Sequence, residues 1–199
     1  MEVRLSESDR VLLNRLRGAD VALMEGRIFS GESGAAGLIL PIFSNTGQKF
    51  GLWNPQGSGI VAKLRRIALT YVSTTGAAGG FVLGHVKDAP AQLATGANIT
   101  AFVEGVLNTS MFNGLIGDPR GPKAKFTPSA ATVTAPVIGR HLGFNQLVIT
   151  AADATNAQWN ARIELDDLAV PPGNAIFLAG NIATLITMAP SIVWEEEKY

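Results

Sequence analysis

The C-terminal stretch, residues 161–199, limits the fold more than any other part of the chain. It begins with alternation over 161–166, where apolar and charged residues would point to opposite sides of a strand. Residues 171–174, Pro-Pro-Gly-Asn, predict a tight turn, because proline presets φ and glycine allows positive φ. Short apolar runs follow and end at Trp194, before three glutamates. The pattern predicts antiparallel sheet close to the end of the chain.

A membrane-spanning helix is the rival interpretation of this stretch. No charged residue lies between Asp167 and Glu195, which is long enough to cross a bilayer. However, prolines, glycines and asparagines would interrupt such a helix repeatedly, and Thr184 and Thr187 favour strand. Buried strands in a sheet or a subunit interface explain the run better, so we expect no membrane as a partner.

The preceding part of the chain repeats this organisation on a smaller scale. Short apolar runs alternate with turn segments rich in Gly, Pro and Asn, at a spacing typical of an all-β sandwich or jelly roll. Runs 38–43 and 49–53 predict a hairpin. Within 60–73 the apolar residues change sides, which predicts a β-bulge near Arg65-Arg66. We predict a jelly-roll-like antiparallel β-sandwich over 38–199.

The first 37 residues predict a separate arm. Ser6 and Asp9 have the spacing of a capping box, and Gly18 occupies the position of a helix C′ residue. Between them lies an apolar stripe at helical spacing. So short a helix is not stable alone, so it must pack on the sandwich, pair with copies of itself or dock on a partner. Residues 30–37 predict a flexible loop, and we assign 1–37 to a helical arm and connector.

The charge composition argues for a protein covered by other subunits. Lys and Arg total 16 and Asp and Glu total 16, so the charges cancel, which disfavours nucleic acid as a partner. Charged residues are only 16% of the chain, against about 25% in ordinary soluble domains. A chain with so few charges should associate readily. Charged residues interrupt 1–17, so we expect no signal peptide.

The sequence offers no convincing catalytic, cofactor or metal site. Cysteine is absent, and the two histidines, His85 and His141, have no metal-site spacing. Gly57-Ser58-Gly59 lacks the context of a nucleophile turn, and no phosphate-binding loop occurs. The run 195–197 is expected to be solvated, as terminal charge runs usually are. We therefore predict a protein that is not an enzyme and has no cofactor.

The tryptophans are better explained by packing than by sugar stacking. Trp53, Trp159 and Trp194 all fall on predicted strands or at their ends, and tryptophan commonly anchors cores and interfaces. Two of these tryptophans and the apolar residues of the arm are the candidate interface residues. This set is Leu5, Val11, Leu12, Leu13, Leu16, Trp53 and Trp194.

Two groups of motifs resemble tailed-bacteriophage β-sandwich virion proteins. One is LWNPQGSG at 52–59 followed by the basic strand 62–67, and the other is VPPGNAIF at 170–177 followed by the acidic-tipped strand 191–196. The resemblance covers residues 45–199. It implies a jelly-roll subunit, commonly trimeric, that decorates or cements a capsid or forms a fibre or spike. The helical arm would then be an attachment or trimerisation element.

Two functions from different classes follow from this resemblance. The first is a capsid cement or decoration subunit in the virion, assembled in the host cytoplasm, with itself and the major capsid protein or other virion proteins as partners. The second is a tail-fibre or tailspike adhesin that binds host carbohydrate through Asp118, Arg120, Asn156 and Trp159. A cupin-type enzyme would need a metal cluster that two distant histidines cannot easily supply. The first function fits the depleted charge best, with Gly114–Pro128 as a functional or interfacial loop.

Overall fold

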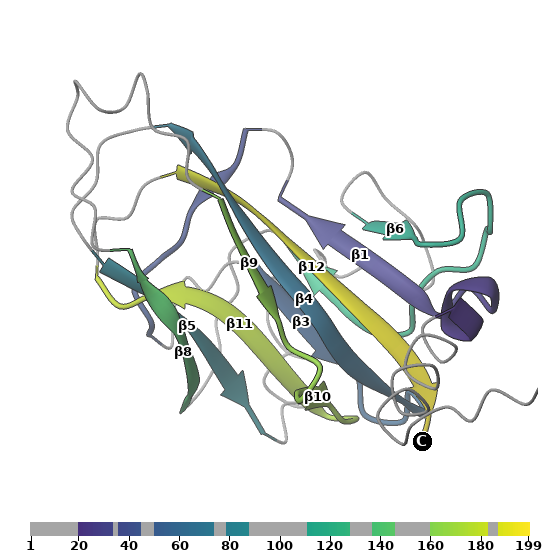
Figure 1. Cartoon of the computed structure of the whole chain (residues 1–199). Helices are drawn as coiled ribbons and strands as arrows, with labels where there is room; N and C mark the ends of the chain where they lie inside the picture. Colours follow the sequence, from purple (N-terminus) through teal and green to yellow (C-terminus); the bar gives the residue numbers. More distant parts are fainter. Residues whose placement is uncertain are drawn as a thin grey trace, which may run out of the picture.

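The protein is built of two antiparallel sheets. The computed structural model describes residues 20–33, 36–44, 50–73, 79–87, 111–127, 137–145, 160–182 and 187–199. Within these ranges twelve strands form a seven-stranded sheet and a five-stranded sheet, here the larger and the smaller sheet (Figure 1). Every pairing between these strands is antiparallel. The predicted all-β, antiparallel class is confirmed.

The larger sheet is centred on two long neighbouring strands, β4 and β12, which run side by side in Figure 1. Its order is β10-β4-β12-β1-β6, with β9 paired to β4 and β2 paired to β12. The bounds are β1 Ile28–Glu32, β2 Leu38–Ile39, β4 Ile60–Ser73, β6 Met111–Asn113, β9 Asn160–Glu164, β10 Ala169–Val170 and β12 Thr187–Lys198.

The smaller sheet has the order β7-β3-β11-β5-β8. The bounds are β3 Gly51–Asn54, β5 Gly79–Val86, β7 Lys125–Thr127, β8 Val137–Asn145 and β11 Asn174–Gly180. The predicted hairpin over 38–53 is wrong, because β2 pairs with β12 in the larger sheet while β3 pairs with β11 and β7 in the smaller one. The chain therefore changes sheet between β2 and β3.

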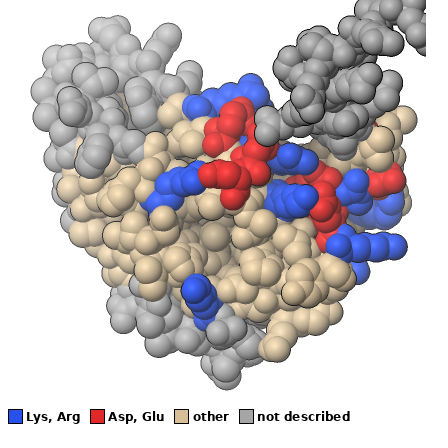
Figure 2. All heavy atoms as spheres, turned by 60° about the horizontal axis from the view of Figure 1, so that its bottom comes forward, with Lys and Arg blue, Asp and Glu red and all other residues tan. Residues whose placement is uncertain are grey.

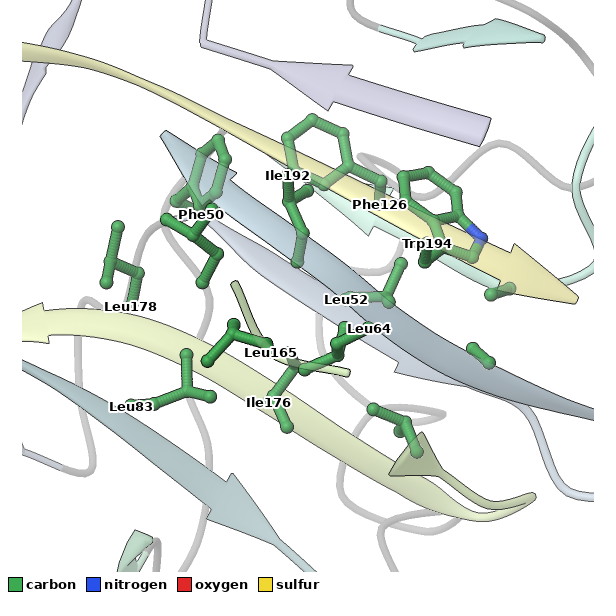
Figure 3. Close-up of a cluster of buried hydrophobic side chains, with 14 of the residues drawn as sticks. Phe50, Leu52, Leu64, Leu83, Phe126, Leu165, Ile176, Leu178, Ile192 and Trp194 are labelled. Carbon is green, nitrogen blue, oxygen red and sulfur yellow. The ribbon is translucent and has the colours of Figure 1, made fainter. Parts of the chain in front are cut away.

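The hydrophobic core lies between the two sheets (Figure 3). Aromatic rings occupy its centre: the ring of Phe126 lies 5.0 Å from that of Phe50 and 6.5 Å from that of Trp194. Leu64 from the larger sheet and Leu83 from the smaller sheet belong to the same buried cluster. Side chains of both sheets thus exclude water from one shared interior, which is the main source of stability for such a domain.

The predicted β-bulge in β4 is confirmed. Val193 pairs with Arg66 and Trp194 with Leu64, so the register skips Arg65. Because of this extra residue, Ile60, Ala62 and Leu64 before the bulge, and Ile67 and Leu69 after it, are all buried. The bulge therefore keeps the apolar side chains of β4 on the core side both before and after it.

The region predicted to be a connector contains an interior strand. β1 lies between β12 and β6, and its Phe29 is buried with its ring 5.9 Å from that of Trp194. The loop prediction failed because Gly31 marks a close approach: a Cβ there would lie 2.8 Å from the ring of Phe126. The predicted helix of the arm lies outside the described residues. Among the described residues, 20–24 form one short helical turn. In the part of the chain that the structure describes, no helix is long and apolar enough to cross a membrane.

Candidate functional site

The two motifs that carry the resemblance meet at a single buried amide. Asn54, at the end of β3, donates hydrogen bonds from Nδ2 to the carbonyls of Ile60 at 2.7 Å and Val170 at 2.9 Å. Its Oδ1 accepts from the hydroxyl of Ser58 at 2.6 Å, and its backbone carbonyl accepts from the N–H of Gly173 at 2.8 Å. This Asn54 junction joins the turn after β3 to the turn before β11, and it also links the smaller sheet to β4 and β10.

The terminal glutamates were predicted to be solvated, and for Glu195 and Glu196 this is wrong. β12 continues past Trp194 to Lys198, and both carboxylates are buried. Glu195 is 2% exposed and lies between two arginines: Arg27 Nη1 is 2.6 Å from its Oε1, and Arg65 binds its Oε2. The bulge in β4 and the start of β1 bring these cations to the carboxylate, which allows the charge to be buried.

The ion pairs extend outward from Glu195. Arg27 also pairs with Glu25 at 2.6 Å, and Arg65 also pairs with Asp166 at 3.3 Å. Figure 2 shows acidic and basic side chains interleaved over one part of the surface, beside a broad area without charge. Charges paired in this way need no complementary charge from a partner molecule.

Glu196 faces the interior at the end of the sandwich. Its carboxylate accepts hydrogen bonds from the backbone N–H groups of Lys123 at 3.0 Å and Ala124 at 2.8 Å, and from Trp194 Nε1 at 3.4 Å. Burial raises the pKa of Glu196, although these hydrogen bonds act in the opposite direction. Glu196 thereby fixes the segment before β7 against the last residues of β12.

A helical turn and a loop are tied together at this end of the molecule. The side chain of Asn113 donates to the carbonyls of Gly26 at 3.2 Å and Arg120 at 3.1 Å. The N–H of Gly114 donates to the carbonyl of Ile28 at 2.7 Å. The turn at 20–26 and the loop at 114–120 therefore form one continuous surface, on the side of β1 and β6 in Figure 1.

This surface exposes large apolar side chains. Ile116 is 97% exposed and Met24 is 72% exposed, and Val21 and Leu23 are exposed beside them. We call these four residues the turn–loop surface. A groove of about 640 Å³ adjoins it, because Met24 also lines the groove, together with Arg27, Arg120, Lys123, Glu196 and Lys198. Exposed apolar groups with a polar border are typical of protein contact sites.

Two of the predicted interface residues lie elsewhere than predicted. Trp53 is 6% exposed and Trp194 is 0% exposed, and Trp194 belongs to the central core cluster. Trp194 has no exposed surface with which to contact a partner and Trp53 has very little, so we reassign both to the core. Leu5, Val11, Leu12, Leu13 and Leu16 lie outside the described residues. The sequence indicated one half of the turn–loop surface, because Ile116 lies in the loop Gly114–Pro128 that we expected to be functional or interfacial, whereas the exposed apolar residues of the turn at 20–26 were missed.

The residues considered for carbohydrate or metal binding are not assembled into a site. Asp118 and Arg120 form a salt bridge with each other, and Asn156 and Trp159 lie outside the described residues. His85 is on β5 and His141 on the neighbouring β8, where they pair with Val137 and Val82 rather than with each other. Among the described residues, no group of three or more His, Asp or Glu side chains could hold a metal ion.

Comparison with known proteins adds no relative to this picture. No protein-family model, no curated protein and no solved structure matches the chain. The resemblance to phage virion proteins therefore stays a prediction, and a functional argument must rest on the motifs and surfaces described above.

Proposed function

We propose that the chain is a non-enzymatic virion structural protein of a tailed bacteriophage, a cement or decoration subunit that stabilises the head through subunit interfaces. The observation that carries the proposal is the turn–loop surface. It gathers four exposed apolar side chains on two segments that Asn113 holds together. A patch of this kind gains free energy when a partner removes it from water.

The surrounding charges favour a protein partner over a charged ligand. Beside the turn–loop surface, Arg27 is already paired with Glu25 and Glu195, and Arg65 with Glu195 and Asp166. Interface cores are depleted in charge, because an unpaired charge loses hydration when it is buried. The charges around Glu195 are already paired within the chain, so a partner that covers them would not bury an unpaired charge there.

The finer points of the proposal concern the arm and the assembly. The predicted helix between Ser6 and Gly18 would be the attachment or trimerisation element. The sandwich would be jelly-roll-like, and the assembled form would be a homotrimer attached to the major capsid protein or other virion proteins. The resemblance of 52–67 and 170–196 to virion proteins supports these points.

The alternative is an adhesin that binds host carbohydrate. Sugar sites use exposed aromatic rings with nearby polar groups. In the described part of the chain Trp53 and Trp194 are buried, and Asp118 and Arg120 bind each other. These observations give the adhesin less support than the cement subunit.

Immunogold electron microscopy of intact particles, with an antibody against the recombinant protein, tests the proposal. We expect label distributed over the head. Label confined to the tail or its tip would contradict the cement function and favour the adhesin, and purified particles without label would contradict a virion location altogether.

A further inference from the structure

A cavity of about 360 Å³ opens between the two sheets, away from the turn–loop surface. Its wall is formed by β4 and β10 of the larger sheet and by β5, β8 and β11 of the smaller sheet. Most of the side chains that reach it are apolar. They include Leu64, Leu83, Leu168, Val170 and Ile176.

The ionisable side chains that line this cavity are basic, and Asn174 adds a neutral amide. Leu83 and His85 share one face of β5, and Lys87 follows directly after the strand ends at Val86, so the lining passes from apolar to basic toward this end of the strand. Arg140 on β8 is the third basic residue. No acidic side chain lines the cavity among the described residues. The lining is therefore complementary to a molecule with an apolar body and an anionic end.

One ion pair connects the sheets at this cavity. Arg140 Nη1 donates to Asp167 Oδ1 at 2.9 Å, and the second guanidinium nitrogen binds the other carboxylate oxygen. Asp167 lies in the turn before β10, whereas Arg140 belongs to β8. A two-point pair of this kind fixes the orientation of the guanidinium. It leaves the ammonium of Lys87 and the ring of His85 as the groups that can meet a ligand anion.

The volume limits the size of the ligand. A cavity of about 150 Å³ accommodates benzene, so by proportion about 360 Å³ accommodates about 14 non-hydrogen atoms. We propose that this cavity binds a small amphipathic monoanion, a medium-chain fatty acid, with its chain against Leu83 and Ile176 and its carboxylate at Lys87 and His85. This binding site does not depend on the proposed virion function.

Calorimetric titration of the full-length protein with decanoate tests the site, with decanol as the uncharged comparison. We expect one decanoate bound per chain, at an affinity about tenfold or more above that of decanol, because only the carboxylate can use the basic end. Equal affinity for both compounds would overturn the assignment of the basic residues. The absence of decanoate binding up to about 1 mM would overturn the site.

Two variants and one control locate the binding. Lys87→Glu reverses an exposed charge at the cavity and should weaken decanoate binding about tenfold or more, whereas Lys198→Glu, the same change at an exposed residue of β12, should leave it unchanged. Ala169→Leu adds apolar volume at an exposed position of the lining and should also weaken binding. Unaltered decanoate affinity in Ala169→Leu, with a native circular dichroism spectrum and melting temperature, would place the ligand elsewhere and overturn the proposal.

Discussion

The Asn54 junction and the buried glutamates of β12 hold loops in place with different kinds of polar group. Asn54 is a neutral amide that both donates and accepts, and its hydrogen bonds satisfy the turns on either side of it. Glu196 is an acceptor only and holds backbone N–H groups, and Glu195 needs two arginines. The amide brings no charge into the interior, whereas each carboxylate must be compensated or protonated.

The neutral amide and the buried carboxylates therefore depend on different conditions. A neutral junction depends on geometry alone, so only the loss of its hydrogen bonds should weaken it. A carboxylate depends also on its cationic partners and on pH, because the ionised form loses hydration on burial. The predictions below separate these dependences.

The largest expected effect is that of Asn54→Ala. The change removes the donor for the buried carbonyls of Ile60 and Val170, so we expect a loss of about 3 kcal/mol in the free energy of unfolding. Its strand partner Asn174 is the matched control, because among the described residues its amide donates to the carbonyls of Pro171 and Pro172 in the adjacent turn alone. Asn174→Ala should cost less than about 1 kcal/mol by guanidinium unfolding. Equal losses would show that Asn54 is no more than a turn residue.

The Arg65→Ala change tests the dependence of Glu195 on its cations. It leaves a carboxylate that is 2% exposed with Arg27 as its remaining ion-pair partner. We expect a loss of about 2 kcal/mol, below the range for breaking a fully buried pair, because Arg65 is one-third exposed and Arg27 remains.

Lys63→Ala is the control for Arg65→Ala. Lys63 Nζ lies 2.7 Å from Glu197 Oε2, but both side chains are exposed. Removal of this pair should therefore lower the free energy of unfolding by less than about 0.5 kcal/mol. Denaturant midpoints of both variants give the comparison. If the two losses were the same, burial of Glu195 would not need Arg65.

Glu196→Gln tests the dependence on pH. Burial raises the pKa of Glu196, so the group's stabilising contribution is fully present below the ordinary carboxyl pKa and is lost as pH rises through the raised value. The unfolding free energy of the wild type should therefore fall relative to that of Glu196→Gln as pH rises above the ordinary carboxyl pKa of about 4.5.

The carboxylates of Asp118 and Asp167 affect stability in a different pH range. Hydrogen bonds from Arg120 and Arg140 lower the pKa of Asp118 and of Asp167, so their contributions are lost only as pH falls below the ordinary carboxyl pKa. They do not overlap the range of Glu196. Over that range Asn54→Ala should differ from the wild type by a constant amount. A constant difference for Glu196→Gln as well would contradict the role of its ionisation.

The predictable parts of the fold are those that local chemistry decides. Within 60–73 the apolar residues change from one side of the strand to the other, and this change predicted the bulge. The alternation can be followed in the sequence of one strand alone, without knowing which strands pair with it. The turn at 171–174 followed from the φ preferences of proline and glycine, and Gly173 has a φ of 83°. Both features are encoded within a few consecutive residues.

The parts that failed depend on residues distant in the sequence. Ser30 and Gly31 predict a loop where β1 continues, yet the ring of Phe126 occupies the space over Gly31. Glu195 is buried because Arg27 and Arg65 reach it from other strands. For Glu196 a signal existed, because it continues the alternation of the apolar residues Ile192 and Trp194. The length of the loop Gly114–Pro128 indicated an interfacial role, but the exposure of Met24 and its neighbours could not be predicted, since packing decides whether isolated apolar residues are exposed.

The smallest effect on stability, and the sharpest test of the turn–loop surface, is expected from Ile116→Asp. Because the side chain is 97% exposed, the free energy of unfolding should change by less than about 0.5 kcal/mol. A buried charge in the contact should nevertheless shift native mass spectra from trimer toward monomer and weaken attachment to particles. Val137→Asp, the same type of change at a 56% exposed residue of β8, should leave assembly intact. Loss of assembly in Val137→Asp alone would move the interface to β8, and a wild type that is monomeric throughout would contradict the proposed trimer.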